Sequence, residues 1–263
     1  MAPRIIACTY VDHQETVRYP VEMVVESCAF ADAHWLFGSD EANTAFMAGI
    51  AARDPGRLRA ECLNHVIRSS ADISRTMNLC VELLRGEADF ILMAQADTLA
   101  TPESAARVLE FCADDRNRAR GMHLGTRDVH MYMDFWTGFG HTLLGSAFDN
   151  QFTGDGSWTG NVDIAFARDP LCIHMGYFTP EACARHFRQH GLTYGEPPQT
   201  QGFHARRAQL FEDDRDEFIR DRMRWLHAYW RQHAWCRYPL QMCGDFDPRC
   251  MAIVEKLGLR DDY

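Results

Sequence analysis

Residues 62–103 constrain the fold most strongly, because they contain two strand patterns joined by an amphipathic helix. The strands are predicted at residues 62–67 and 90–94. The helix pattern places four apolar residues on one stripe: Ile73, Met77, Val81 and Leu84. Two strands joined by a helix of this length predict a βαβ unit with parallel strands.

The same alternation occurs on both sides of this segment. Strands are predicted at residues 4–9 and 34–37, and helices are predicted from Pro20, over residues 41–52 and over residues 102–112. Later residues break the alternation, since 121–135 read as strands and 136–160 as a long irregular segment. The sequence therefore predicts an α/β fold with a mainly parallel, mixed sheet flanked by helices.

The C-terminal part of the chain has a different pattern. Residues 193–202 are rich in Gly, Pro and Gln, which is typical of a linker, and residues 204–235 predict a long Arg-rich helix. We therefore expect a sheet domain at residues 1–192, followed at 193–263 by a linker and a helical C-terminal extension.

Composition indicates a globular, cytoplasmic protein. The chain has 263 residues, of which 46% are hydrophobic, and its net charge of −10 does not favour a polyanionic partner. No apolar run is long enough to span a bilayer, and no signal peptide is visible. The ten cysteines include no CxxC pair, so reduced thiols are expected. A zinc site at Cys236, Cys243 and Cys250 is the less favoured interpretation.

Asp97 is the first candidate for chemistry. It follows the buried strand at residues 90–94, and open α/β sheets bind ligands at the carboxyl ends of their strands. Its carboxylate is also the kind of oxygen ligand that Mg²⁺ or Mn²⁺ prefers. The sequence therefore predicts metal-assisted chemistry on a nucleotide.

Four short motifs occur in an order and at a spacing that resemble the nucleotide-binding half of GT-A-fold glycosyltransferases, particularly the family-2-like members. The motifs are Thr9-Tyr10, Gly38-Ser39-Asp40, Ser74-Arg75-x-x-Asn78 and Gln95-Ala96-Asp97. The resemblance implies a Rossmann-like GT-A domain and a metal-dependent transfer of sugar from a nucleoside-diphosphate sugar, with a UDP-sugar favoured, to an acceptor hydroxyl. It assigns nucleotide-sugar binding to Thr9, Tyr10, Asp40, Arg75, Asn78, Gln95 and Asp97.

The resemblance also implies the remaining site residues. Gln95 replaces the first acidic residue of the family's metal motif, so Asp97 needs a second protein ligand, for which His174 is the candidate. The family's usual base position reads Gly-Asn, which leaves Asp155 or Asp163 to accept the proton of the acceptor, or a retaining reaction without such a base. Trp136 and Trp158 bracket the segment where an acceptor would bind.

Other interpretations of these residues remain open. Asp40 could cap the following helix, and Arg75 could lie on a solvated helix face. A nucleotidyltransferase with a related sheet and a catalytically degenerate GT-A binding module are the alternative functions. The segment 222–237, with four Arg and three Trp, makes a nucleic-acid acceptor a minor alternative.

Overall fold

The computed structural model describes residues 2–12, 21–130, 133–148, 152–153, 157–158, 162–165, 171–174, 181, 183–184, 187–188 and 202–232. The chain divides into two compact units. The first unit comprises Met1–Thr126 and Phe139–Ile173, and the second comprises Arg127–Gly138 and His174–Tyr263. The predicted boundary between residues 192 and 193 lies outside the described residues and stays a prediction.

The N-terminal half alternates strands and helices, as predicted. In chain order its elements are β1 (Ile5–Val11), α1 (Val21–Ser27), β2 (Ala33–Gly38), α2 (Glu41–Ala51), β3 (Leu58–Cys62), α3 (Ser70–Leu84), β4 (Phe90–Met93), β5 (Thr98–Ala100) and α4 (Pro102–Cys112). The elements that follow are η1 (Asp115–Ala119), β6 (Gly121–His130), β7 (Met133–Gly145), β8 (Phe152–Thr153), β9 (Ser157–Trp158), β10 (Val162–Ala165) and β11 (Cys172–His174).

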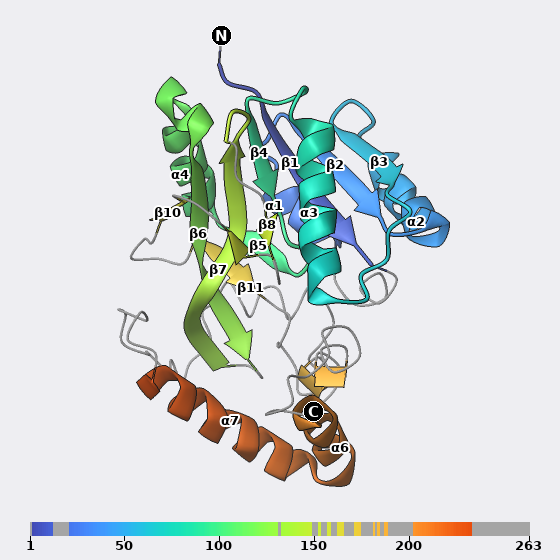
Figure 1. Ribbon diagram of the computed structural model, residues 1–263, viewed down its shortest axis with the longest axis vertical. Helices are drawn as coiled ribbons and strands as arrows, with labels where there is room; N and C mark the ends of the chain where they lie inside the picture. The colour runs from blue at the N-terminus through green and yellow to red at the C-terminus, as the bar shows by residue number, and fades with distance from the viewer. Residues whose placement is uncertain are drawn as a thin grey trace. The chain divides into compact units, whose positions relative to one another are not determined.

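These strands form a mixed sheet in the order β3-β2-β1-β4-β7-β6-β11-β5, with β10 also paired to β6 (Figure 1). The pairs β3–β2, β2–β1 and β1–β4 are parallel, whereas β4 and β7 are antiparallel. Helices cover the parallel part of the sheet. The predicted α/β fold with a mainly parallel, mixed sheet flanked by helices is therefore confirmed.

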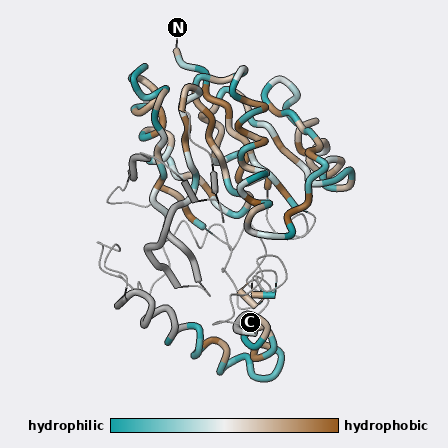
Figure 2. Tube along the Cα trace, in the orientation of Figure 1, coloured by the Kyte–Doolittle hydropathy of each residue, from teal (hydrophilic) through white to brown (hydrophobic). Residues whose placement is uncertain are grey.

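Two apolar clusters hold the helices on opposite faces of this sheet. One cluster joins α3 to strand residues that face it: Ile6, Cys8, Phe37, Ile91, Met93, Val81 and Leu84. The other joins α1 and α2 to the opposite face: Val11, Leu36, Leu58, Val21, Val25, Met47 and Ile50. Figure 2 shows apolar residues concentrated along these strands. Because successive strand residues point to opposite faces, the short apolar runs supply both clusters.

Two predicted strand boundaries are wrong. The third strand covers Leu58–Cys62 rather than residues 62–67, because its pairing with β2 begins at His34 and Leu58. The segment 136–160 is not wholly irregular, since β7 extends to Gly145 and pairs with β4 in the register Met93↔Thr142. Both errors concern pairing with a distant strand, which local composition does not encode.

The C-terminal helical prediction is confirmed, but the predicted single helix is two helices. These are α6 (Phe203–Asp213) and α7 (Arg215–Gln232). Asp214 separates them in an extended conformation, with φ −153° and ψ 95°, and its carboxylate accepts a hydrogen bond from the Glu217 backbone N–H at 2.9 Å. The acidic residue therefore ends one helix and caps the next.

Within the second unit, an apolar cluster packs the two helices around Phe187 and Phe218. The guanidinium groups of Arg207 and Arg222 lie 5.5 and 5.1 Å from the centroid of the Phe187 ring, and Arg207 pairs with Asp221 at 2.9 Å. Arg222, one of the four arginines of the segment 222–237, is therefore buried rather than available at the surface. No described helix combines the length and the apolar composition that crossing a bilayer requires.

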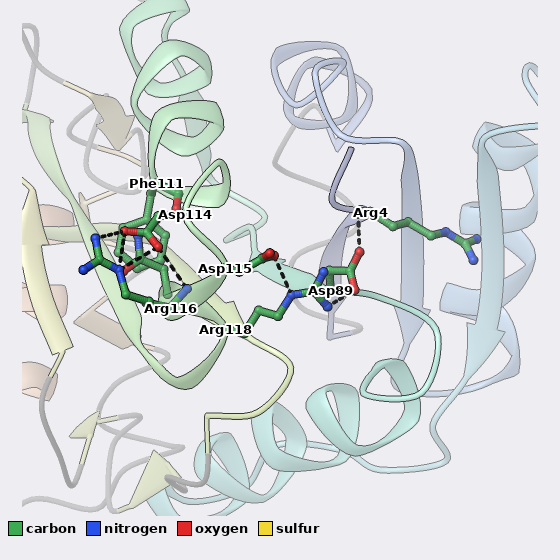
Figure 3. A network of polar contacts seen from close by, with 8 residues as sticks. Arg4, Asp89, Phe111, Asp114, Asp115, Arg116 and Arg118 are labelled. Carbon is green, nitrogen blue, oxygen red and sulfur yellow. Dashed lines mark hydrogen bonds and ion pairs between the residues drawn. The ribbon is translucent and has the colours of Figure 1, made fainter. Parts of the chain in front are cut away.

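Asp89 connects the amino-terminal ends of two strands to η1 (Figure 3). It precedes β4, and one carboxylate oxygen accepts a hydrogen bond from the Arg4 backbone N–H at 2.7 Å. The other oxygen pairs with the guanidinium of Arg118, which also contacts Asp115 at 3.2 Å. The Arg4 N–H and the Arg118 guanidinium hold the pKa of the Asp89 carboxyl below its usual value.

We expect Asp89→Asn to lower the free energy of unfolding by about 1 kcal/mol at neutral pH. Because the folded-state pKa is lowered, this stabilisation is complete above the ordinary pKa of about 4 and is lost as pH falls through the folded-state value. Urea unfolding at pH 7 and at pH 3 measures the effect. Asp115→Asn, at a carboxylate 88% exposed, is the control and should cost less than about 0.5 kcal/mol. A parent–variant difference as large at pH 3 as at pH 7 would contradict the assignment.

Candidate functional site

The carboxyl ends of the parallel strands β1 to β4 lie on one edge of the sheet (Figure 1). We call the residues at these ends and directly after them the carboxyl rim: Tyr10–Asp12, Ser39–Asp40, residues 63–68 and residues 94–97. Backbone bonds connect neighbouring segments, with Ser39 N–H donating to Val11 at 3.1 Å and Ala94 N–H donating to Cys8 at 2.8 Å. Three of the four motif segments therefore lie on one edge, where open α/β sheets bind ligands.

Residues 63–68 turn over the ends of β1 and β2. The Tyr10 hydroxyl donates to the carbonyl of His65 at 2.6 Å, and the buried Asp12 carboxylate accepts from the Ile67 backbone N–H at 3.1 Å. Asn64 has a φ of 49°, in the left-handed region that Asn tolerates better than most residues. Asp12 was not among the predicted site residues, although its place directly after the first strand is a signal for such a role.

Thr9 and Asp40 both have structural partners. Thr9 is buried, and its hydroxyl lies 2.9 Å from Nε2 of the buried His34. Asp40 Oδ1 accepts from the backbone N–H of Asn43 at 2.8 Å and from its Nδ2 at 2.9 Å, so Asp40 caps α2. The capping interpretation of Asp40 is therefore confirmed. The contact between the half-buried Asp40 carboxylate and a nucleotide stays a prediction.

The Arg75 and Asn78 side chains belong to α3, whose N-terminal end follows the 63–68 segment of the rim. Arg75 is exposed and Asn78 is half-buried. Ser69 caps the helix by accepting from the Asp72 backbone N–H at 3.3 Å. The Ser69 hydroxyl and the Arg68 N–H in turn hold the pKa of Asp72 below its usual value. The first turn of α3 thus carries a negative charge of its own.

Gln95, Ala96 and Asp97 form a turn between β4 and β5. The buried Thr98 hydroxyl lies 3.0 Å from Gln95 Oε1 and 3.2 Å from Asp97 Oδ1, so its single proton can serve either oxygen. The Gln95 backbone N–H donates to Nδ1 of His141 at 3.3 Å. Gln95 is exposed and Asp97 is half-buried, which leaves both side chains at the rim.

Asp97 has the oxygen chemistry that Mg²⁺ uses when it binds through one carboxylate together with substrate phosphates and water. Among the described residues, no three His, Cys, Asp or Glu side chains are close enough together to hold a metal ion. His174 ends β11 and belongs to the second unit, whereas Asp97 belongs to the first. The shared metal site of Asp97 and His174 stays a prediction.

The predicted catalytic and acceptor residues fall where side chains are not described. Asp155 lies outside the described residues, between β8 and β9. The backbone of Asp163 lies in β10 opposite Met122 of β6, and the backbones of Trp136 and Trp158 lie in β7 and β9. Strand β8 lies against α3. The hairpin that brackets Asp155 therefore starts beside the helix that carries Arg75 and Asn78.

Comparison with known proteins gave structural neighbours but no sequence match. No family model matches the chain, and no curated protein matches it. A structure of Staphylococcus aureus TarS with UDP-GlcNAc has a TM-score of 0.46 at 12% identity, over 70% of this chain and 64% of that one. Mannose-1-phosphate geranyltransferase from Thermus thermophilus has a TM-score of 0.37 at 15% identity, over 56% of this chain and 58% of that one.

A third neighbour is a CMP-2-keto-3-deoxy-manno-octonic acid synthetase with CTP, whose TM-score is 0.37 at 11% identity, over 54% of this chain and 74% of that one. The chain spans less than two thirds of the first two proteins. The TM-scores of these three neighbours are all below 0.5.

Proposed function

We propose that the protein is a metal-dependent glycosyltransferase that moves a sugar from a nucleoside-diphosphate sugar, with a UDP-sugar favoured, to an acceptor hydroxyl. The observation that carries the proposal is the Gln95–Asp97 turn at the end of β4, on the same carboxyl rim as Tyr10 and Asp40. The proposal assigns the diphosphate and its cation to Asp97, and the nucleoside to the rim residues that follow β1 and β2.

The charges of the rim support a requirement for a cation. Carboxylates follow three strand ends, at Asp12, Asp40 and Asp97, and a fourth, Asp72, lies in the first turn of α3. Helix N-termini often bind phosphate through free N–H groups, but here Asp40 and Ser69 already accept from the first turns of α2 and α3. A diphosphate next to these carboxylates would be repelled unless Mn²⁺ or Mg²⁺ lay between them.

The chemistry of sugar transfer also needs a divalent cation. Cleavage of the bond between sugar and diphosphate builds negative charge on the leaving group, and a cation held by a rigidly placed carboxylate neutralises that charge. Asp155 or Asp163 would take the proton of the acceptor hydroxyl, with Trp136 and Trp158 contacting the acceptor. His174 is proposed as the second protein ligand of the cation. A nucleic-acid acceptor is not favoured, because Arg222, one of the four arginines of the segment 222–237, is buried and cannot contact phosphate.

A panel of UDP-, GDP- and dTDP-sugars, each with Mn²⁺ and each repeated with EDTA, tests this function. We expect one nucleotide sugar to raise the melting temperature by about 5 °C or more at a hundredfold excess over its Kd, and to release nucleotide only when Mn²⁺ is present. Stabilisation by nucleoside triphosphates alone, with release of pyrophosphate, would instead indicate a nucleotidyltransferase. Binding without turnover in any metal would indicate a degenerate binding module.

A further inference from the structure

We propose that His141 is a positioning residue, which holds the Gln95–Asp97 turn in place from the neighbouring strand β7. Its effect on turnover rests on the proposed function, whereas its effect on the turn itself does not. His141 is not one of the residues that the sequence singled out, and it has no exposed surface with which to touch a substrate.

The position of His141 follows from the antiparallel pairing of β7 with β4. The register Met93↔Thr142 places His141 across from Ala94, directly before the turn. Gly140, the preceding residue, allows β7 to approach its neighbours closely, because a Cβ atom there would lie 2.6 Å from Thr126 Oγ1 and 2.7 Å from Cys172 Cβ. The close packing of β7 at Gly140 therefore fixes the position of the His141 imidazole next to the end of β4.

The hydrogen bonds of His141 define its tautomer. The Gln95 backbone N–H donates to Nδ1 at 3.3 Å, so Nδ1 must be unprotonated and Nε2 must carry the proton. Nε2 lies 3.8 Å from the buried Sγ of Cys28, the residue directly after α1. Burial lowers the pKa of His141 to about 4, although the nearby Asp97 carboxylate acts in the opposite direction. The neutral ring is thus an acceptor for the turn on one side and a neighbour of α1 on the other.

The turn is consequently held on two sides. Thr98 lies within hydrogen-bonding distance of the side chains of Gln95 and Asp97, and His141 accepts from the backbone of Gln95. Loss of the imidazole acceptor would leave the Gln95 N–H without its protein partner and would release one side of the turn. The Asp97 carboxylate would then sample more orientations, and groups that orient a metal ligand typically change metal affinity by about 10- to 100-fold.

Three variants separate a positioning role from a general role in the core. His141→Leu removes both ring nitrogens. His141→Asn keeps a polar atom near the place of Nδ1, whereas His141→Gln places its amide nearer to Nε2. His123→Leu is the control, because His123 lies on the adjacent strand β6 and its Nδ1 is 2.9 Å from the Thr142 hydroxyl, so this contact is not with the Gln95 backbone.

Amide hydrogen exchange of the full-length chain, followed at Gln95 to Asp97, tests the effect on the turn without any ligand. We expect His141→Leu and His141→Gln to speed exchange at Gln95 by about tenfold or more, His141→Asn to restore most of the protection, and His123→Leu to leave it unchanged. Unchanged exchange at Gln95 in both His141→Leu and His141→Gln would overturn the proposal.

Titration with Mn²⁺ and a UDP-sugar tests the consequence for the site. The same two variants should raise the Kd of the nucleotide by about tenfold or more, with rescue by Asn. Loss of binding in Asn and Gln alike would overturn the positioning role. If the parent chain binds no nucleotide, the proposed function fails, while the exchange measurement still decides whether His141 holds the turn.

Discussion

Asp97→Asn is expected to lower kcat/KM for a nucleotide sugar by about 10²- to 10³-fold and to abolish the effect of Mn²⁺ on nucleotide binding. The substitution keeps the size of the side chain and an oxygen that can accept from Thr98, whose hydroxyl lies 3.2 Å from Asp97 Oδ1. What it removes is the negative charge that would bind the cation. Turnover and nucleotide Kd, each measured with Mn²⁺ and with EDTA, check the prediction.

Glu110→Gln is the matched control for this experiment. Glu110 is an exposed carboxylate on α4 whose described ion pair is with Arg107, so its neutralisation should leave turnover within about twofold of the parent. An Asp97→Asn chain that binds UDP and Mn²⁺ as tightly as the parent would show that the carboxylate at the end of β4 is not the metal ligand.

The largest expected loss of stability comes from Gly145→Ala, at the end of β7. A Cβ atom at this residue would lie 2.2 Å from the carbonyl oxygen of Arg118 and 2.4 Å from its carbonyl carbon. Backbone bonds from Gly145 N–H to Arg120 and from Ala147 N–H to Arg118, both 2.9 Å, hold the two segments together. Because the clash is with backbone, we expect a loss of about 3 kcal/mol in the free energy of unfolding, measured by urea denaturation.

Gly49→Ala provides the opposite case in the same protein. Gly49 lies within α2, and a Cβ atom there would meet nothing within 4 Å. Alanine has the higher helix propensity, so the variant should gain about 0.5–1 kcal/mol. A Gly145→Ala chain as stable as the parent would show that β7 and η1 are not in close contact.

The parts of the site that could be predicted are those that short segments define. The run Phe90–Met93 is buried on both faces of the sheet, so its apolar sequence identified β4 and placed the Asp97 turn at its end. Thr101 and Pro102 likewise marked the start of α4, where the structure has a capping box. A cap, a turn and a buried strand each depend on neighbours within a few residues.

The parts that could not be predicted depend on residues far apart in the chain. Asp12 bonds to Ile67 and His141 bonds to Gln95, across 55 and 46 residues, and the local sequence does not show that either pair will meet. The sequence of β7 contains Gly138, Gly140 and Gly145, and Gly is depleted in strands, so the segment resembles a loop until its pairing with β4 is known. Its strand conformation at the three glycines is stabilised by that pairing, because Gly itself does not favour a strand.

The sequence by itself determined the alternation of strands and helices, and with it the edge of the sheet on which Asp97 and Asp40 lie. Only the tertiary structure decided that β7 inserts antiparallel beside β4 and brings His141 beneath the turn. The physical reason is that hydrophobic period and capping act within one element, whereas strand order is set by the burial of whole faces, to which every element contributes.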